Sequence, residues 1–185
     1  MSEHPTQHAI EQFASALERH SVEYCIIGGI AARFYGSKRL TRDIDILSKG
    51  GLENLTRLAN ALHDLGARVG TRAPEADDLR GMNTRWETKV GRIDVLLAAD
   101  GPHHGRVTYR DVAGRIVQAT HAQITLNMVS PVDLIRLKTA TGRPHDHADI
   151  AAVIDAHPEL AHMRPKSKPG DLGAPRPAPS AERER

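Results

Sequence analysis

Three aspartates in strand-like segments are the side chains of this sequence best suited to chemistry. Asp43 and Asp45 alternate with Ile44 and Ile46. Because successive side chains of a strand point to opposite faces, both carboxylates share one face while the isoleucines point into the core. Neighbouring carboxylates repel each other, and a hard divalent cation with oxygen ligands is the usual way to neutralise them. The pair therefore predicts a site for Mg²⁺ or Mn²⁺.

A third carboxylate, Asp94, lies in the aliphatic run at residues 92–98. Burying it without a partner would cost several kcal/mol, so it must lie at a strand end or face a polar site. Asp94 is the natural third metal ligand.

Gly28 and Gly29 end a short apolar run at residues 24–27. Without side chains, their amides can approach a phosphate closely at the start of a helical turn predicted for residues 30–35. We therefore expect the glycine pair to bind nucleotide phosphate.

The order of these residues resembles the nucleotidyltransferase superfamily with the DNA polymerase β type fold. In that pattern a glycine pair precedes Asp-apolar-Asp by about ten to thirteen residues, and a third carboxylate follows on a later strand. The segment R-x-T-x-D-I-D at residues 39–45 and KTATGRPHDHADI at residues 138–150 are also similar to the AbiEii-type abortive-infection toxins and their small relatives. The resemblance covers residues 20–155.

This resemblance implies an α+β fold, with a small mixed sheet flanked by helices, and transfer of a nucleoside monophosphate from an NTP. The acceptor would be an RNA such as tRNA, or a protein, and the protein would act as the toxin of a toxin–antitoxin pair, with an antitoxin as partner. All three aspartates would be catalytic metal ligands for Mg²⁺ or Mn²⁺, with Asp43 and Asp45 on the triphosphate side. Asp94 would also accept the acceptor's proton.

A triphosphate needs cationic side chains besides the metals, and the family pattern assigns Arg39 and Lys138 to it. Thr41 shares a face with Asp43 and can donate a hydrogen bond to a phosphate, although a strand-forming threonine needs no function. By contrast, Lys38 and Arg42 fit a solvated surface.

Asp146 matches an acidic position of the relatives. It fits two interpretations: it orients Arg143 or Lys138 by ion pairing, or it is a solvated carboxylate in the first turn of a helix. The sequence leaves both open.

Eleven histidines invite a zinc interpretation. However, His145 and His147 are two residues apart on a predicted helix and point in nearly opposite directions. His103 and His104 fall in a predicted loop, and no cysteine accompanies either pair. Structural zinc is therefore not expected.

Two other functional classes compete with the enzyme. The first is a non-catalytic nucleotide- or partner-binding module that retains the fold, although such a module needs none of the three carboxylates. The second is a nucleotide-sugar glycosyltransferase that uses Asp43 and Asp45, which generally requires a longer chain. Nucleotidyl transfer is the preferred hypothesis.

Composition supports one domain in a reducing compartment. The chain has 185 residues, 3% aromatic residues and a single cysteine, Cys25, which cannot form an intramolecular disulfide. No apolar run approaches the roughly twenty residues that span a bilayer, and residues 1–8 have no apolar signal region. These features predict a cytoplasmic protein without a membrane segment.

Periodicity and end signals place the elements around the candidate site. Helices are predicted at residues 6–19, 52–65, 130–141 and 144–157, and the helix at 52–65 should bury a stripe formed by Leu52, Leu55, Leu58, Leu62 and Leu65. Strands are predicted at 24–27, around 43–46, and at 84–90 and 92–98, which should form a hairpin, with two or three short strands at 106–128. We expect a nucleotidyltransferase-like domain at residues 1–162, with a core at 20–128 and C-terminal helices at 130–157. The proline-rich segment 163–185, with six basic residues and three acidic ones from residue 164 on, is predicted to be a disordered tail.

Overall fold

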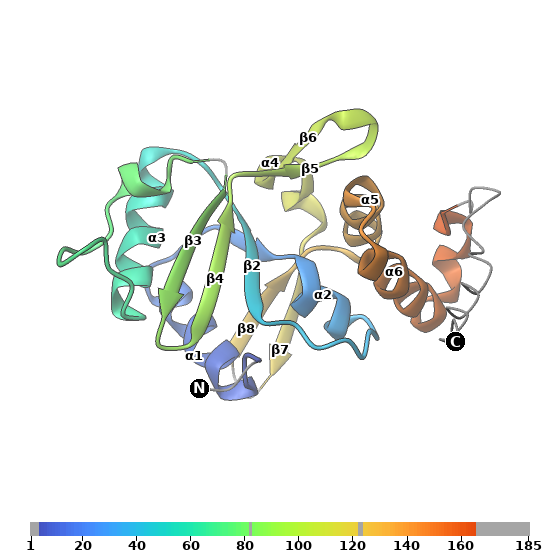
Figure 1. The fold of residues 1–185 in the computed structure, drawn as a ribbon, viewed down its shortest axis with the longest axis horizontal. Helices are drawn as coiled ribbons and strands as arrows, with labels where there is room; N and C mark the ends of the chain where they lie inside the picture. Colours follow the sequence, from blue (N-terminus) through green and yellow to red (C-terminus); the bar gives the residue numbers. More distant parts are fainter. Residues whose placement is uncertain (1–3, 82, 122–123, 166–185) are drawn as a thin grey trace, which may run out of the picture.

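The structure is a computed structural model that describes residues 4–81, 83–121 and 124–165 (Figure 1). Its centre is a mixed sheet with the strand order β3-β4-β2-β1-β8-β7. The strands of this sheet are β1 (Tyr24–Ile26), β2 (Asp43–Ser48), β3 (Asn83–Thr88), β4 (Gly91–Leu96), β7 (Val117–His121) and β8 (Ile124–Met128). A separate antiparallel hairpin joins β5 (Ala98–Asp100) to β6 (Arg106–Thr108). The predicted α+β class with a mixed sheet is confirmed.

Strands β2 and β4 lie side by side in the sheet as a parallel pair. β2 pairs antiparallel with β1 and parallel with β4, while β3 and β4 form the predicted hairpin. β8 runs parallel to β1 and antiparallel to the edge strand β7. The strands that carry the predicted acidic residues are therefore direct neighbours.

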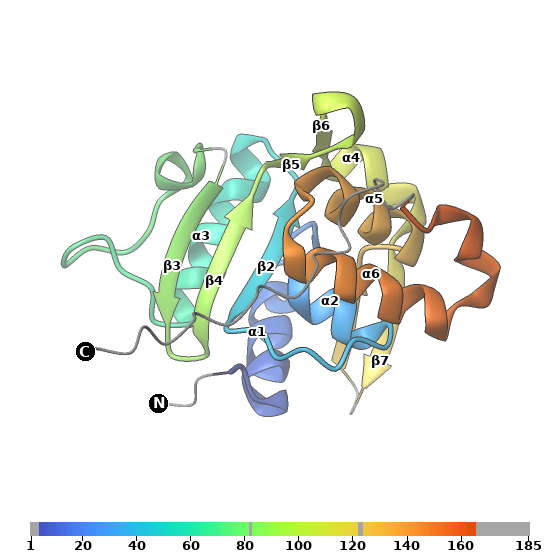
Figure 2. The same ribbon diagram turned by 45° about the vertical axis from the view of Figure 1, so that its right-hand side comes forward.

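Helices cover both faces of the sheet (Figures 1 and 2). They are α1 (Gln7–Arg19), α2 (Gly28–Phe34), α3 (Leu52–Asp64), α4 (Tyr109–Val112), α5 (Pro131–Thr141) and α6 (Pro144–Ala156), with short 3-10 turns at Ala76–Leu79, Pro102–His104, Ala113–Arg115 and Pro158–Met163. Helices α1 and α3 pack together on one face, and α2, α5 and α6 lie together on the other. The polar face of β2 and β4 thus opens toward α2, α5 and α6.

The core between sheet and helices is aliphatic, as the composition predicts. Its largest fully buried side chains are Phe13, Leu17, Ile26, Ile44, Ile46, Leu47, Leu58, Leu62, Leu79, Ile93, Met128 and Leu134. Ile44 and Ile46 are fully buried, so the predicted alternation along β2 is confirmed. The buried isoleucines fix which face of β2 its aspartates occupy.

The two C-terminal helices begin and end where their sequence signals indicate. The Ser130 hydroxyl accepts a hydrogen bond from the Asp133 amide at 3.1 Å and so caps α5. Gly142 ends α5 with a φ of 60°, a left-handed conformation that favours glycine. Pro144 opens α6 directly afterwards. This tight corner holds α6 against α5.

Three details differ from the sequence predictions. The strand expected at 92–98 ends at Leu96, because residues 98–100 leave the sheet to pair with β6. Between β6 and β7 the chain forms the short helix α4, whose capping box joins Thr108 and Asp111. Leu52, expected in the buried stripe of α3, is 63% exposed because it lies at the first position of the helix.

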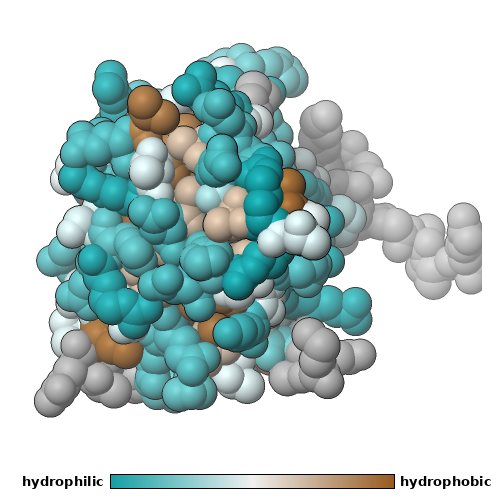
Figure 3. Space-filling view, turned by 90° about the vertical axis from the view of Figure 1, so that its left-hand side faces the viewer, coloured by the Kyte–Doolittle hydropathy of each residue, from teal (hydrophilic) through white to brown (hydrophobic). Residues whose placement is uncertain are grey.

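The face beside α3 and β3 is mainly hydrophilic, and hydrophobic residues show only in small areas (Figure 3). Among the described residues, no helix is both long and apolar enough to cross a membrane. Of the predicted tail, Met163 ends a 3-10 turn and Arg164 pairs with Asp155 at 2.8 Å, whereas residues 166–185 lie outside the described part of the chain.

Candidate active site

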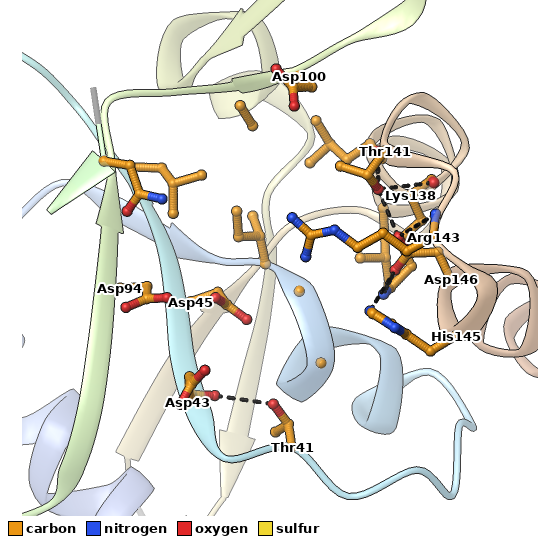
Figure 4. A pocket seen from close by; sticks show the side chains of 18 of the residues that line it. Thr41, Asp43, Asp45, Asp94, Asp100, Lys138, Thr141, Arg143, His145 and Asp146 are labelled. Atoms are coloured by element: carbon orange, nitrogen blue, oxygen red, sulfur yellow. Dashed lines mark hydrogen bonds and ion pairs between the residues drawn. The ribbon is translucent and has the colours of Figure 1, made fainter. Parts of the chain in front are cut away.

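A cavity of about 750 Å³ lies between the polar face of β2 and β4 and the helices α2, α5 and α6. All eight residues that the sequence assigned to catalysis and nucleotide binding line it: Gly28, Gly29, Arg39, Thr41, Asp43, Asp45, Asp94 and Lys138. Figure 4 shows the three aspartates on one wall and the α5–α6 corner on the opposite wall. The fold therefore brings together residues that are up to 110 positions apart in the chain.

Strand register explains why the carboxylates meet. β2 and β4 pair in parallel, with Asp45 beside Asp94 and Asp43 beside Arg92. Residues paired in adjacent strands point to the same side of the sheet, so Asp45 and Asp94 are direct neighbours. Asp94 is buried, and the other two carboxylates are partly buried.

The environment of Asp45 disfavours its negative charge. Burial is the main reason that its pKa rises to about 6, and the charges of Asp94 and Asp43 raise it further. A hydrogen bond from the Gly29 amide and the charge of Lys138 act in the opposite direction but do not compensate. Burial and two neighbouring carboxylates thus disfavour the ionised form of Asp45 on the wall formed by β2 and β4.

Both glycines permit close packing against the acidic strand. A Cβ atom at Gly28 would lie 2.1 Å from Asp45 Oδ2, and one at Gly29 would lie 2.6 Å from the Cβ of Thr41. The Thr41 hydroxyl donates to the Asp43 carbonyl oxygen at 3.3 Å. The two glycines therefore let the side chains of Asp45 and Thr41 pack closely against α2. Their role in phosphate binding stays a prediction.

Two arginines that the sequence analysis did not assign hold two of the three carboxylates. Arg85 of β3 is bidentate: its Nε and Nη2 donate to the two carboxylate oxygens of Asp94 at 2.8 and 2.9 Å. Arg92 Nε donates to Asp43 Oδ1 at 2.6 Å. Asp45 lies between these pairs without a guanidinium bound to it in any described hydrogen bond.

The Arg85–Asp94 and Arg92–Asp43 ion pairs affect how the site could bind a metal ion. Within residues 4–81, 83–121 and 124–165, no three carboxylate, histidine or cysteine side chains are grouped closely enough to ligate one ion. The donor chemistry nevertheless fits a hard divalent cation, because three carboxylates face one cavity and Asp45, partly buried among them, has a raised pKa. Arg85 binds both oxygens of Asp94 and Arg92 binds Oδ1 of Asp43, so these oxygens would have to be released for an ion to use them.

Lys138 lines the cavity and is bound by two carboxylates, and its role in nucleotide binding stays a prediction. Its Nζ donates to Asp146 Oδ1 at 2.7 Å and to Asp149 Oδ2 at 2.8 Å, and the residue is only 6% exposed. The interpretation that Asp146 orients Lys138 by ion pairing is thereby confirmed, and the alternative of a solvated carboxylate is wrong, because Asp146 is buried. Thr141 adds a hydroxyl bond to Asp146 at 2.8 Å.

Arg39 belongs to the same network. Its Nε and Nη2 donate to the carboxylate of Asp149, with a shortest distance of 2.8 Å, and the Ser37 hydroxyl donates to Asp149 at 2.7 Å. Burial alone would raise the pKa of Asp149, but the hydrogen bonds from Arg39, Lys138 and Ser37 outweigh it and hold the pKa at about 2. This network, formed by Ser37, Arg39, Lys138, Asp146 and Asp149 and here called the buried ionic cluster, ties α5 and α6 to the segment before β2.

Two cations on the opposite wall and rim are better placed to meet a ligand than Lys138. The exposed side chain of Arg143, at the α5–α6 corner, extends into the cavity toward the aspartates (Figure 4). Arg42 is exposed as expected, but it also lines the cavity, whereas Lys38 is exposed outside it.

The histidines form no common site among the described residues. His103 and His104 are exposed in the β5–β6 loop, both with positive φ. His145 lines the cavity, and its Nε2 lies 3.7 Å from Asp146 Oδ1. His147, two residues further along α6, is exposed.

Three functional candidates escaped the sequence analysis although their spacing carries a signal. Asp149 follows Asp146 by three residues and therefore shares its helix face. Arg92 precedes Asp94 by two residues on one strand and therefore shares its sheet face. Arg85 gives no such local signal, because its position opposite Asp94 depends on the register of the β3–β4 hairpin.

Comparison with known proteins supports the fold. Neither a protein-family model nor a curated protein matches the sequence. Among solved structures, the chain is similar to the lincosamide antibiotic adenylyltransferase LnuA with lincomycin bound, at a TM-score of 0.58 and 17% identity, over 83% of this chain and 99% of that one. It is also similar to ANT(2'')-Ia in complex with adenylyl-2''-tobramycin, at a TM-score of 0.57 and 17% identity, over 86% of this chain and 95% of that one.

These likenesses show that the chain has the fold of nucleotidyltransferases, as its glycine and aspartate pattern predicts. Identity this low shows the fold alone. The finer resemblance to AbiEii-type toxins stays a prediction.

Proposed function

We propose that the protein is a Mg²⁺-dependent nucleotidyltransferase. An acceptor hydroxyl oxygen would attack the α-phosphorus of an NTP, the bond from that phosphorus to the bridging oxygen would break, and pyrophosphate would leave. The hydroxyl proton would pass to a carboxylate of the site or to water. The products are the nucleotidylated acceptor and pyrophosphate.

One observation carries this proposal. Asp43, Asp45 and Asp94 face a single cavity of about 750 Å³, and burial, together with the charges of its two carboxylate neighbours, raises the pKa of Asp45 to about 6. Three neighbouring carboxylates on one wall destabilise the fold, because like charges with reduced access to water repel each other. Such a wall is suited to holding a cation in a fold that nucleotidyltransferases share.

The chain's own side chains divide the work. Asp43, Asp45 and Asp94 would hold Mg²⁺ or Mn²⁺, which when bound supplies charge neutralisation for the triphosphate and activates the acceptor oxygen. Arg143 and Arg42, exposed and directed at the cavity, would bind phosphate oxygens, for which the guanidinium fork is well shaped. Arg39 and Lys138 would act indirectly, because the buried ionic cluster fixes the corner that carries Arg143.

An anionic acceptor, such as the end of a tRNA or another RNA, fits the cavity lining best. Seven lysine or arginine side chains line the cavity against five aspartates. The AbiEii resemblance adds the hypotheses of a toxin role, an antitoxin partner and a cytoplasmic location, with a protein as the other macromolecular acceptor. These remain part of the proposal.

A small hydroxyl compound is the second candidate acceptor. The likeness to LnuA and ANT(2'')-Ia extends over 99% and 95% of those chains, and their structures hold lincomycin and adenylyl-2''-tobramycin. The chain therefore spans nearly the whole of two proteins solved with small molecules.

Labelled transfer assays would test the proposal and separate the acceptors. The protein is incubated with each α-labelled NTP and Mg²⁺, together with bulk tRNA, a protein extract or a set of small polyhydroxyl compounds. We expect label in one acceptor fraction, lost with EDTA and in Asp45→Asn, and retained in the matched variant Asp78→Asn outside the cavity.

The binding-module alternative makes the opposite prediction. A non-catalytic module would bind NTP and transfer nothing, and Asp45→Asn would change no activity. Nucleotide binding without label in any fraction, for all four NTPs, would favour that alternative over the enzyme.

A further inference from the structure

The polar face of the sheet carries an array of charges in two rows. Strand register places Arg85, Asp94 and Asp45 across β3, β4 and β2 in one row, with Glu87, Arg92 and Asp43 in the next. In each row, an arginine is bound to a carboxylate of the candidate metal site. The two arginines therefore take the place that a cation would fill.

A guanidinium and a metal ion cannot use the same oxygens equally well. Arg85 engages both oxygens of Asp94, at 2.8 and 2.9 Å, while a bound Mg²⁺ needs direct oxygen contacts at about 2.1 Å. Arg92 engages Oδ1 of Asp43. As long as these bonds persist, the carboxylates point at the arginines instead of at a common centre.

The exposure of Arg85 and Arg92 indicates that both side chains can release their carboxylate partners. The side chain of Arg85 is 58% exposed and that of Arg92 is 33% exposed, so water can replace their lost hydrogen bonds. The side chain of Asp94 is only 9% exposed and needs a replacement partner. Both arginines line the cavity, where a polyphosphate would offer planar guanidinium groups new oxygens.

We propose that Arg85 and Arg92 are exchangeable counter-ions of the acidic site. Each holds its carboxylate in the metal-free protein, releases it when a divalent ion binds, and then binds phosphate oxygens of the nucleotide. They are positioning residues for the metal and binding residues for the triphosphate. This inference rests on the proposed nucleotidyltransferase function.

Metal and nucleotide affinities of the full chain test the exchange directly. Mn²⁺ binding is measured by EPR with and without a non-hydrolysable NTP analogue, for the wild type, Arg85→Gln and Arg92→Gln. Without nucleotide, each variant should bind Mn²⁺ about tenfold more tightly than the wild type, because no guanidinium competes. With Mn²⁺ saturating, each should bind the analogue about tenfold more weakly.

Matched variants separate competition from a general change of charge. Arg106→Gln removes a charge from the same cavity, but Arg106 pairs with Asp100 outside the acidic array. Arg72→Gln breaks a bidentate pair with Asp78 outside the cavity. If Arg106→Gln tightens Mn²⁺ binding as much as Arg85→Gln, simple electrostatics explains the result and the exchange is wrong.

Thermal denaturation covers the case in which a variant is unstable. Arg85→Gln leaves Asp94 without its partner, so the metal-free variant should melt earlier, and Mn²⁺ should raise its melting temperature by more than it raises that of the wild type. Equal shifts would overturn the exchange even if the variant is only partly folded.

The two levels of the proposal fail differently. Mn²⁺ that binds the wild type with nucleotide, but with unchanged affinity in both arginine variants, overturns the exchange and leaves the proposed function standing. Mn²⁺ that binds no variant under any condition overturns both.

Discussion

Two groups of buried or partly buried acidic residues lie beside the same cavity, and they differ in how their charge is balanced. In the buried ionic cluster, Asp149 receives hydrogen bonds from Arg39, Lys138 and Ser37, which hold its pKa at about 2. On the acidic wall, burial and two carboxylate neighbours raise the pKa of Asp45 to about 6, and its one backbone donor does not compensate. One carboxylate is stabilised as an anion and the other is not.

The difference separates structure from function. A carboxylate with all its oxygens satisfied by cations and hydroxyls strengthens one arrangement of the chain, here the contact of α5 and α6 with residues 37–39. A carboxylate left with excess negative charge weakens the fold until a cation arrives. Substitutions in the first group should therefore affect stability, and those in the second should affect activity.

Removal of the central cation of the cluster should have the largest effect on stability. Lys138→Met leaves Asp146 and Asp149 buried beside an apolar side chain, which should lower the free energy of unfolding by about 3–5 kcal/mol in urea denaturation. Arg136→Met on the same helix removes a half-exposed side chain that contacts the buried Asp133 at 3.4 Å. It should cost less than about 1 kcal/mol, because Arg115 remains bound to that carboxylate. A stable Lys138→Met protein that binds NTP poorly would support the sequence prediction that Lys138 is a nucleotide ligand.

On the acidic wall, Asp45→Asn should reduce transfer by about a hundredfold or more, equivalent to about 2.7 kcal/mol of transition-state stabilisation. The variant should be at least as stable as the wild type without metal, because it removes a charge that its neighbours repel. Transfer rates and thermal melting of the same preparation test both parts. A strongly destabilised Asp45→Asn protein would mean that the two acidic groups do not differ as proposed.

Acid should unfold the protein partly through Asp149. Its folded-state pKa of about 2 lies below the unfolded value of about 3.9, so its stabilising effect is complete above about pH 4 and is lost as pH falls toward 2. The loss should amount to about 2–3 kcal/mol, measured as the pH dependence of the unfolding free energy. Asp149→Asn should flatten this dependence, and an unchanged slope would contradict the assignment.

The smallest effect should come from Arg39→Lys. The variant keeps the charge beside Asp149 but loses the bidentate contact, while Lys138 and Ser37 remain as donors. We expect a loss of about 1 kcal/mol in unfolding free energy. The exposed neighbour Lys38 serves as control, since Lys38→Ala should change stability by less than about 0.5 kcal/mol.

Much of the fold and of the acidic wall follows from local sequence signals. The alternation of aspartate and isoleucine determines which side chains of β2 face the core. Serine, proline and glycine mark the ends of α5 and α6, and the Gly28–Gly29 pair marks the turn before the site. These features depend on neighbours within a few residues, so periodicity and capping rules suffice to predict them.

The tertiary structure alone decided which charged side chains form ion pairs with each other. Lys138 is long enough to reach a nucleotide or a carboxylate, and only the packing of α6 against α5 places Asp146 and Asp149 at its Nζ. Likewise, the hairpin register, and no local pattern, sets Arg85 opposite Asp94. Electrostatic partners are chosen by distances of about 3 Å across elements remote in sequence, and a linear pattern of residue types does not contain those distances.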